Sequence, residues 1–225
     1  MDEAFGQRVA RVGALADPVR RALYRFVAEA PGAVSRDQAA SGVDVPRHTA
    51  KFHLERLVEE GLLVTEFRRL TGRTGPGAGR PAKLYRRSRR ELTVSLPSRR
   101  YDLAGQVLAD AVERTLSGTP IADALVAAVD EAAGQVATAD RDLADALGAM
   151  GYEPRADGAA LVLGNCPFDR IAADHRGLVC GSEDGLNRAF VDGLVRRLGG
   201  PGATTEPVAP GPGCCVRVGG AATHP

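Results

Sequence analysis

The chain has 225 residues, of which 44% are hydrophobic and 25% are charged, and its formal net charge is +1. This composition excludes a chain that is disordered throughout, and the length allows two modest domains. The small total hides an asymmetry, because residues 1–100 carry a net charge of +9 and residues 101–225 a net charge of −8. The split predicts a nucleic-acid-binding part followed by an acidic part with a different task.

The chain contains no apolar run of membrane-spanning length, and its first residues lack the basic and apolar regions of a signal peptide. We therefore expect a cytoplasmic protein that has no membrane partner. In that reducing compartment, cysteines favour metal or redox chemistry over structural disulfides.

Short helices are predicted at the start of the chain. A first helix over residues 5–16 is followed by Asp17-Pro18, which supplies an N-cap and a proline at the first helical position of a second helix. Ser35, with Gln38 three residues later, forms a capping box that opens a short third helix. Gly42 is then predicted to make the tight turn into the next helix.

The strongest helical pattern runs over residues 44–63, with Pro46 in the first turn and Gly61 at the end. Its apolar positions share one face: Ala50, Leu54, Leu57 and Val58. A short helix, a tight turn and a second helix form a helix-turn-helix, whose second helix lies in the DNA major groove. The residues of this helix predicted to contact DNA are Arg47, His48, Thr49, Lys51 and His53. For His53, a packed and hydrogen-bonded role beside Phe52 and Leu54 at core positions is an equal alternative.

Residues 62–70 and 83–87 are predicted to be the two strands of a wing, joined by a loop too rich in Gly and Pro for regular structure. Between residues 66 and 100 there are 11 basic residues and 2 acidic ones. Arginines on such a hairpin suit phosphates and a narrow minor groove. The wing residues predicted to bind DNA are Arg68, Arg69, Arg73, Arg80 and Lys83.

The rest of the chain is predicted to mix helices with a small antiparallel sheet. The expected helices cover residues 102–116, 121–135, 140–150 and 184–198, and the expected strands residues 152–155, 159–163, 204–208 and 214–218, with a turn at residues 156–158. The fold class is mainly α with an α+β C-terminal domain. The predicted domains are a winged helix-turn-helix (residues 1–90), a linker or dimerisation helix (residues 91–118) and an α+β sensor domain (residues 119–225).

All four cysteines lie in the acidic part: Cys166, Cys180, Cys214 and Cys215. Thiolates that converge from separate loops suit zinc or an iron–sulfur cluster. Because side chains alternate along a strand, Cys214 and Cys215 should point to opposite faces, so that one of the two is spare. His175 is a candidate fourth ligand, and cysteines that pack as small hydrophobic residues are the alternative.

Residues 10–90 resemble the arsenic-responsive family of winged-helix repressors, through Ala-Leu-Ala-Asp-Pro-Val-Arg, Phe-His-Leu-Glu-Arg-Leu-Val-Glu-Glu-Gly-Leu-Leu and Gly-Arg-Pro-Ala-Lys-Leu-Tyr-Arg. The whole chain resembles the iron–sulfur-sensing repressors of the SUF cluster-assembly operon, through Asn-Cys-Pro-Phe, His-Arg-Gly-Leu-Val-Cys and Gly-Cys-Cys-Val. The resemblance implies a homodimer on double-stranded operator DNA and a cluster, of the 4Fe-4S type, that favours repression. Its ligands would be Cys166, Cys180 and one of Cys214 or Cys215, with Cys214 favoured.

Three functions follow from these patterns. The first is a repressor that senses an iron–sulfur cluster or redox status through its C-terminal cysteines. The second is a winged-helix regulator without a cluster that responds to a small apolar ligand, zinc or thiol oxidation. The third, a cysteine enzyme with an accessory DNA-binding domain, is disfavoured because the chain has no CxxC motif, nucleophile elbow or phosphate loop.

Overall fold

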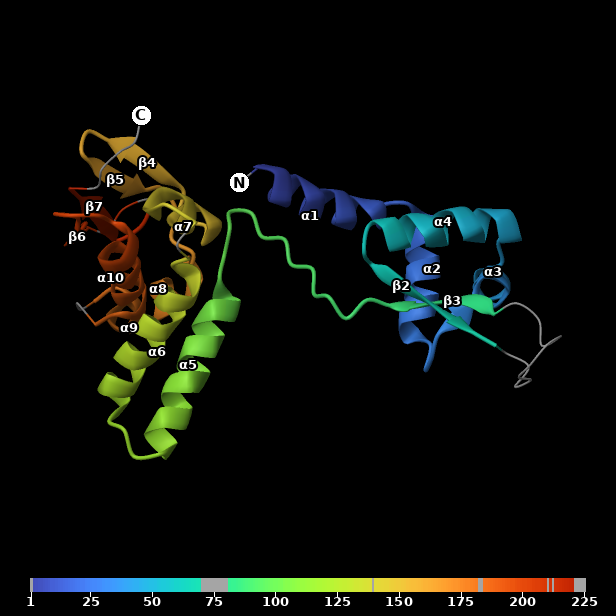
Figure 1. The fold of residues 1–225 in the computed structure, drawn as a ribbon, viewed down its shortest axis with the longest axis horizontal. Coiled ribbons are helices and arrows are strands. Elements are labelled where there is room, and N and C mark those ends of the chain that lie inside the picture. The colour runs from blue at the N-terminus through green and yellow to red at the C-terminus, as the bar shows by residue number, and fades with distance from the viewer. Residues whose placement is uncertain are drawn as a thin grey trace. The chain divides into compact units, whose positions relative to one another are not determined.

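The computed structural model describes residues 2–69, 81–138, 140–181, 184–209, 211 and 213–220. The chain divides into two compact units, residues 2–94 and residues 95–225, which we call the N-terminal unit and the C-terminal unit (Figure 1). Helices predominate in both units and each unit contains a small sheet. The predicted fold class, mainly α with an α+β C-terminal domain, is confirmed.

The helices of the N-terminal unit are α1 (Asp2–Ala14), α2 (Pro18–Glu29), α3 (Arg36–Val43) and α4 (Arg47–Glu59). The predicted caps are present. The Asp17 carboxylate accepts a hydrogen bond of 2.8 Å from the backbone N–H of Arg20 at the start of α2. The Ser35 hydroxyl accepts one from Gln38 N–H, and the Gln38 side chain accepts one from Ser35 N–H, at 3.2 and 2.8 Å. The reciprocal bonds satisfy two of the free N–H groups at the start of α3.

The turn between α3 and α4 is made by Asp44, so its assignment to Gly42 was wrong. Asp44 has a φ of 54°, in the left-handed region, and its N–H caps α3 by bonding to the carbonyls of Ala40 and Ser41. Gly42 lies inside α3, where an added Cβ would come within 2.0 Å of a ring carbon of Phe26. A side chain at position 42 would therefore displace the Phe26 ring.

The sheet of the N-terminal unit has three antiparallel strands in the order β1-β3-β2. Its strands are β1 (Val34–Ser35), β2 (Leu63–Arg68) and β3 (Ala82–Arg87). The two long strands form the predicted wing, with Leu63 opposite Arg87 and Arg68 opposite Ala82. The two-residue β1 was not predicted, because it coincides with the capping residue of α3 and shows no alternation.

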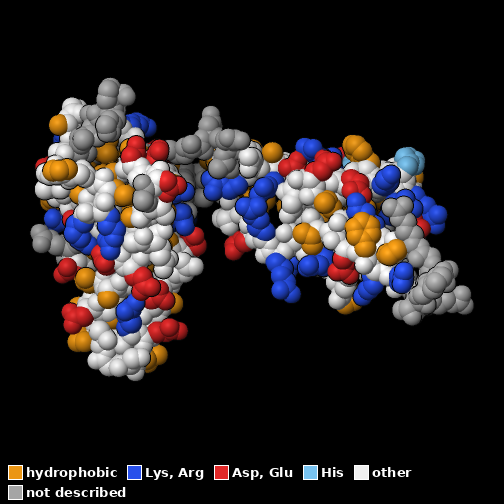
Figure 2. All heavy atoms as spheres, in the orientation of Figure 1, with side chains coloured by type: hydrophobic (Ala, Val, Ile, Leu, Met, Phe, Trp, Pro, Cys, Tyr) orange, Lys and Arg blue, Asp and Glu red, His pale blue; other side chains and the backbone are white. Residues whose placement is uncertain are grey.

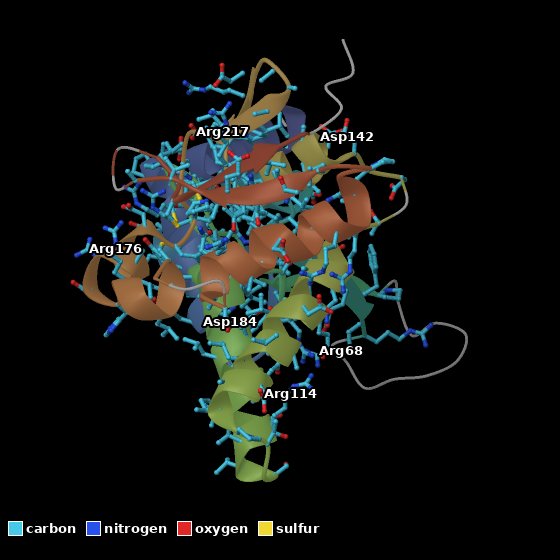
Figure 3. All side chains as sticks on the ribbon, turned by 90° about the vertical axis from the view of Figure 1, so that its left-hand side faces the viewer. Arg68, Arg114, Asp142, Arg176, Asp184 and Arg217 are labelled. Carbon is cyan, nitrogen blue, oxygen red and sulfur yellow. The ribbon has the colours of Figure 1, made fainter. Side chains whose placement is uncertain are left out.

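The helices of the C-terminal unit are α5 (Tyr101–Leu116), α6 (Ile121–Val136), α7 (Leu143–Ala149), α8 (Asp169–Asp174), α9 (Arg176–Val179) and α10 (Leu186–Leu198). The short helices α8 and α9 were not predicted. In Figure 1, α5 and α6 run side by side. An ion pair of 2.5 Å between Arg114, which is labelled in Figure 3, and Glu131 joins the same two helices.

The helix α5, which lies in the segment 91–118 predicted as a linker or dimerisation helix, packs within the C-terminal unit. Its inward side chains are buried in the core of the C-terminal unit: Leu103, Ala104, Val107 and Ala111. Since the apolar stripe is covered by the same chain, α5 belongs to the C-terminal unit, which begins at Ser95. Towards the end of α5, the apolar side chains of Val112 and Leu116 point outward, at 51% and 83% exposure.

The second sheet has four antiparallel strands in the order β4-β5-β7-β6. Its strands are β4 (Pro154–Asp157), β5 (Ala160–Leu163), β6 (Thr204–Pro207) and β7 (Val216–Gly219). The first hairpin turns at residues 158–159, where residues 156–158 were predicted, with Gly158 at a φ of 60°. Within the described residues, we find no helix whose length and hydrophobicity would let it cross a membrane.

Candidate functional site

Helix α4 has one face in the core and one face in solvent, as predicted. Ala50, Leu54 and Leu57 have no exposed surface. The outward candidates Arg47, His48 and Lys51 are exposed, and Thr49 is half-buried. The side chains predicted to contact DNA at the start of this helix are therefore accessible, with the exception of Thr49, which is partly covered.

His53 has the packed role that was the alternative to DNA contact. It is 8% exposed, and its Nδ1 accepts a hydrogen bond of 3.3 Å from Nε of Arg20 on α2. The neighbouring Phe52 was predicted at a core position, and this prediction was wrong, because its side chain is 65% exposed. The Phe52 ring meets the His53 ring edge-on, with centroids 5.2 Å apart.

Lys83 is bound within the N-terminal unit and is not a free phosphate ligand. Its Nζ donates to both carboxylate oxygens of Glu55 at 2.7 Å, and the Tyr85 hydroxyl donates to the same carboxylate at 2.7 Å. Burial alone would raise the pKa of Glu55, but the hydrogen bonds from Lys83 and Tyr85 outweigh it and hold that pKa below its usual value. This partly buried contact fixes the wing strand β3 to α4.

Two of the wing arginines predicted to bind DNA are exposed at the far end of β2: Arg68 and Arg69. Arg73 and Arg80, predicted to contact DNA from the wing loop, lie outside the described residues. Figure 2 shows Lys and Arg side chains on the visible surface of the N-terminal unit, next to hydrophobic ones. The unit thus presents cations from both the helix and the wing, as phosphate binding requires.

The four cysteines, which we call the cysteine cluster, come together in the C-terminal unit. Cys166 follows β5, Cys180 ends α9, and Cys214 and Cys215 precede β7. Each thiol interacts with a neighbouring thiol of the cluster strongly enough to shift its pKa, in the pairs Cys166–Cys214, Cys214–Cys215 and Cys215–Cys180. The sulfur atoms are the yellow sticks of Figure 3, and all four cysteines are free thiols. Four cysteines from three separate segments therefore line one cavity.

Cys214 and Cys215 do not point to opposite faces of a strand, which corrects the expected alternation. Strand β7 begins only at Val216, so the two cysteines lie in the preceding loop. The Asn187 side-chain amide donates to both sulfurs, at 3.2 Å for Cys214 and 3.3 Å for Cys215. Both sulfurs therefore face the same group.

Asn187 is a site residue that the sequence analysis missed. It has no exposed surface and lies on α10, and its amide oxygen accepts a hydrogen bond of 2.9 Å from the hydroxyl of buried Tyr152. The Tyr152 bond leaves the amide N–H groups directed at the sulfurs. The available signal was a polar residue between Leu186 and Phe190, two apolar positions on the buried side of the same helix.

The cysteine cluster alternates between hydrogen-bond donors and acceptors. Hydrogen bonds from Cys180 and then Cys214 lower the pKa of Cys215 to about 3, although burial opposes this. The interaction with Cys214 also lowers the pKa of Cys166, and because Cys214 has one S–H, its bonds to Cys215 and to Cys166 are alternatives. Donating these bonds raises the pKa values of Cys180 and Cys214, and burial adds to the rise. Cys166 and Cys215 therefore have thiolate character, which metal ligation and nucleophilic reactions both need.

A cavity of about 140 Å³ opens beside the sulfurs. Besides the four cysteines, its lining includes Asp169 and Arg176, and Arg176 is labelled in Figure 3. His175 is exposed and is not among the described lining residues. In the part of the chain that the structure describes, no three His, Cys, Asp or Glu side chains are spaced around an ion in this conformation. Ligation by three of the cysteines would therefore require their thiols to rearrange.

A larger cavity of about 330 Å³ lies elsewhere on the C-terminal unit, against α6 and α10. Its lining includes paired charges. Asp130 accepts hydrogen bonds of 2.7 Å from Arg196 and Arg197, and these, that of Arg197 foremost, lower the pKa of Asp130 to about 2. None of the four cysteines lines this cavity. We therefore assign the candidate functional site of the unit to the cysteine cluster.

The segment before α5 is bound to the loop that carries Cys166. Arg99 donates to the side-chain oxygen of Asn165 at 2.5 Å and to the carbonyl of Cys166 at 3.2 Å. The Asn165 amide donates in turn to the carbonyls of Ser98 and Gly151, at 2.9 and 2.6 Å. The Asn-Cys-Pro-Phe motif therefore holds residues 98–100 as well as presenting a thiol.

A comparison with family models gives one match, described as a helix-turn-helix domain, over residues 15–66. The chain carries a helix-turn-helix domain. The matched residues include α2, α3 and α4 and end in β2. The presence of this domain supports the assignment of the protein as a DNA-binding transcriptional regulator. Comparisons with curated proteins and with solved structures found no match.

Proposed function

We propose that the protein is a transcriptional repressor of the cytoplasm, which binds double-stranded operator DNA as a homodimer and senses iron–sulfur or redox status through the cysteine cluster. The helix-turn-helix domain supports the DNA-binding part of this proposal. The observation that carries the sensing part is the meeting of four free thiols from three separate segments, two of them bound by one buried amide, that of Asn187. Apolar side chains exposed on α5, at Val112 and Leu116, are available for contact with a second copy.

The donor set of the cysteine cluster fits a soft metal group. Four thiols, two of them with lowered pKa values, border a cavity that opens to solvent, and no harder ligand competes among the described lining residues except Asp169. Cys166, Cys180 and Cys214 would hold an iron–sulfur cluster of the 4Fe-4S type, with Cys215 as the further donor. When bound, such a cluster supplies a redox-sensitive bond between the three segments that carry these cysteines.

Ligation at Cys166 would also restrain residues 98–100, which belong to the segment that leads to the DNA-binding unit. The carbonyl of Cys166 and the amide of the preceding Asn165 accept hydrogen bonds from Arg99. Fixing the Cys166 loop therefore fixes residues 98–100, and its release frees them. The ligation state would bias the arrangement of two recognition helices in a dimer, and hence its affinity for the operator.

The experiment compares wild-type protein and Cys166→Ser, both purified without oxygen, in binding to duplex DNA selected by the wild type. We expect the wild type to contain iron and acid-labile sulfide in equal amounts, to show a broad visible absorption band, and to bind more tightly than Cys166→Ser. Equal affinities would refute the sensing role of the cluster. Lys51→Ala, which removes an exposed cation of α4 and touches no cysteine, serves as the control for weakened binding at the DNA surface itself.

A thiol switch is a second candidate, favoured by the direct contact between the thiols of Cys215 and Cys180. With a peroxide as the oxidant, the two thiols would give up two electrons and two protons to form one disulfide, and the peroxide would be reduced to water. The same purified protein separates the candidates, since a thiol switch is colourless and reversible by dithiol reductants. Zinc in place of iron and sulfide would point to the remaining alternative, a zinc-binding regulator.

A further inference from the structure

Phe52 occupies the middle of the solvent face of α4. His48, Phe52 and Glu55 follow each other at i, i+4 and i+7 and so share one face of the helix. The buried residues Leu54 and Leu57 belong to a set displaced by two positions, which is about 200° around the helix. The face that enters the major groove in a helix-turn-helix is therefore centred on an aromatic ring.

Exposure of a single apolar side chain is common on proteins and carries no argument by itself. The position of Phe52 on the solvent face of α4, by contrast, is informative. Its ring is 65% exposed and is flanked on the same helix by the exposed side chains of His48 and Lys51. A histidine and a lysine suited to phosphates and base edges thus lie beside an apolar group on the recognition helix.

The hydrogen bonds of Glu55 restrict which bases this face of α4 can recognise. A carboxylate at this position could accept a hydrogen bond from the amino group of cytosine. Here both Glu55 oxygens are already bound by Lys83, and Tyr85 donates to one of them. The centre of the face is left with one polar group, His48, and one apolar group, Phe52.

We propose that Phe52 packs against the C5-methyl group of a thymine and thereby makes thymine a specific element of each operator half-site. The thymine methyl is the apolar group that base pairs present in the major groove, and apolar side chains recognise it by contact. This inference rests on the proposed DNA-binding function. It adds a base preference that the cationic residues around Phe52 do not provide.

The test begins with selection of binding sites from a randomised duplex library by the full-length wild-type protein. Each thymine of the selected site is then replaced by deoxyuridine, which keeps the base pair and removes one methyl group. We expect one position in each half-site where the replacement weakens binding about fourfold, the effect of removing one buried methyl-sized group. Phe52→Ala should bind the thymine and uracil duplexes equally.

Phe67→Ala is the matched control, because Phe67 is an aromatic residue of similar exposure, 66%, on the wing strand β2. It should keep the full discrimination between thymine and uracil. Because both side chains are exposed, both variants should keep the wild-type melting temperature, which shows that they fold.

A wild type that selects a site but tolerates deoxyuridine at every position would overturn the inference and leave the DNA-binding function standing. Retained discrimination in Phe52→Ala would do the same, as would a change of oligomeric state in that variant, which would place Phe52 between subunits. If the wild type binds no duplex at all, the proposed function fails and the inference fails with it.

Discussion

Arg99 donates a 2.5 Å hydrogen bond to the side-chain oxygen of Asn165, the residue directly before Cys166. Asn165 is 7% exposed, and its side-chain nitrogen donates to the carbonyls of Ser98 and Gly151. One amide thus connects the segment before α5, the turn before β4 and the loop that carries a thiol. Changes in this loop reach residues 98–100 through direct contacts, without a longer path.

Removing the Arg99 side chain should uncouple the cysteine cluster from DNA binding. In Arg99→Ala, we expect protein with and without iron and sulfide to bind the selected duplex with nearly equal affinity, whereas the wild type distinguishes the two states. The iron content and visible spectrum should stay at wild-type values, because Arg99 contacts the Cys166 carbonyl and not its sulfur. Equilibrium binding of both states of both proteins measures the coupling.

Arg155→Ala is the control for this experiment, because Arg155 is an exposed arginine of the same unit whose ion-pair partner, Glu153, lies 3.9 Å away. It should keep the wild-type difference between the two states. If Arg99→Ala keeps that difference as well, residues 98–100 do not transmit the ligation state.

Gly42→Ala should destabilise the N-terminal unit by about 1–3 kcal/mol, the usual cost of an added group that forces its neighbours to shift. The new Cβ would lie 2.0 Å from the Phe26 ring, so the ring or α3 must shift. Gly13→Ala on α1 is the matched control, because a Cβ there meets nothing within 4 Å. It should be neutral or slightly stabilising, since alanine is the better helix former. Urea denaturation of the three proteins provides the comparison, and equal stability of all three would contradict the packing role of Gly42.

Local signals in the sequence were sufficient for most of the helices. The caps at Asp17 and Ser35 and the apolar stripe of α4 are encoded within a few residues of each other, and the structure contains all three. Phe52 and Gly42 were misassigned because their roles depend on residues far away in the sequence. No other element of the described chain covers the Phe52 ring, and the Phe26 ring lies against Gly42. Periodicity places a side chain on a face but does not say which other element packs there.

The same limit applies to the candidate site. That the four cysteines belong together followed from their residue type and region, whereas the roles of Asn187 and Arg99 depend on hydrogen bonds across 27 and 66 residues of sequence. The loop placement of Cys214 and Cys215 replaced the expected alternation because the strand begins directly after the pair. Long-range pairing of polar groups has no periodic signature in a single sequence.

DNA binding should weaken steeply with salt. A dimer whose cations neutralise five to nine phosphates should give a slope of about −4 to −8 when the logarithm of the association constant is plotted against that of the salt concentration. Arg68→Ala, which removes an exposed wing cation, should make the slope shallower by about one for each phosphate that is no longer neutralised. Lys83→Met should leave the slope unchanged, because Lys83 is held by Glu55. Fluorescence anisotropy at several salt concentrations measures the slopes, and a flat response in the wild type would rule out the wing as a phosphate-binding element.

Cys215 should be the most acid-tolerant nucleophile of the cysteine cluster. Hydrogen bonds from Cys180 and Cys214 lower its pKa to about 3, so in reduced, metal-free protein it is a thiolate throughout the range from about pH 5 to pH 8. Its alkylation by iodoacetamide should therefore change little across that range. An ordinary thiol, with a pKa near 8.5, gains about tenfold in rate for each pH unit over the same interval. Cys180, whose pKa is raised by the bond it donates to Cys215, should react more slowly than an ordinary thiol.

Peptide mapping by mass spectrometry after brief labelling at both ends of that pH range assigns the modified residue. Asn187→Leu is the informative variant, because it removes the N–H donors to Cys214 and Cys215 while filling a similar volume. With one donor removed, the pKa of Cys215 should rise and its labelling at the acidic end should fall relative to the basic end. If labelling at the acidic end is as slow at Cys215 as at Cys180, the thiolate does not reside on Cys215; faster labelling of Cys180 than of Cys215 would show that the order of donor and acceptor is reversed.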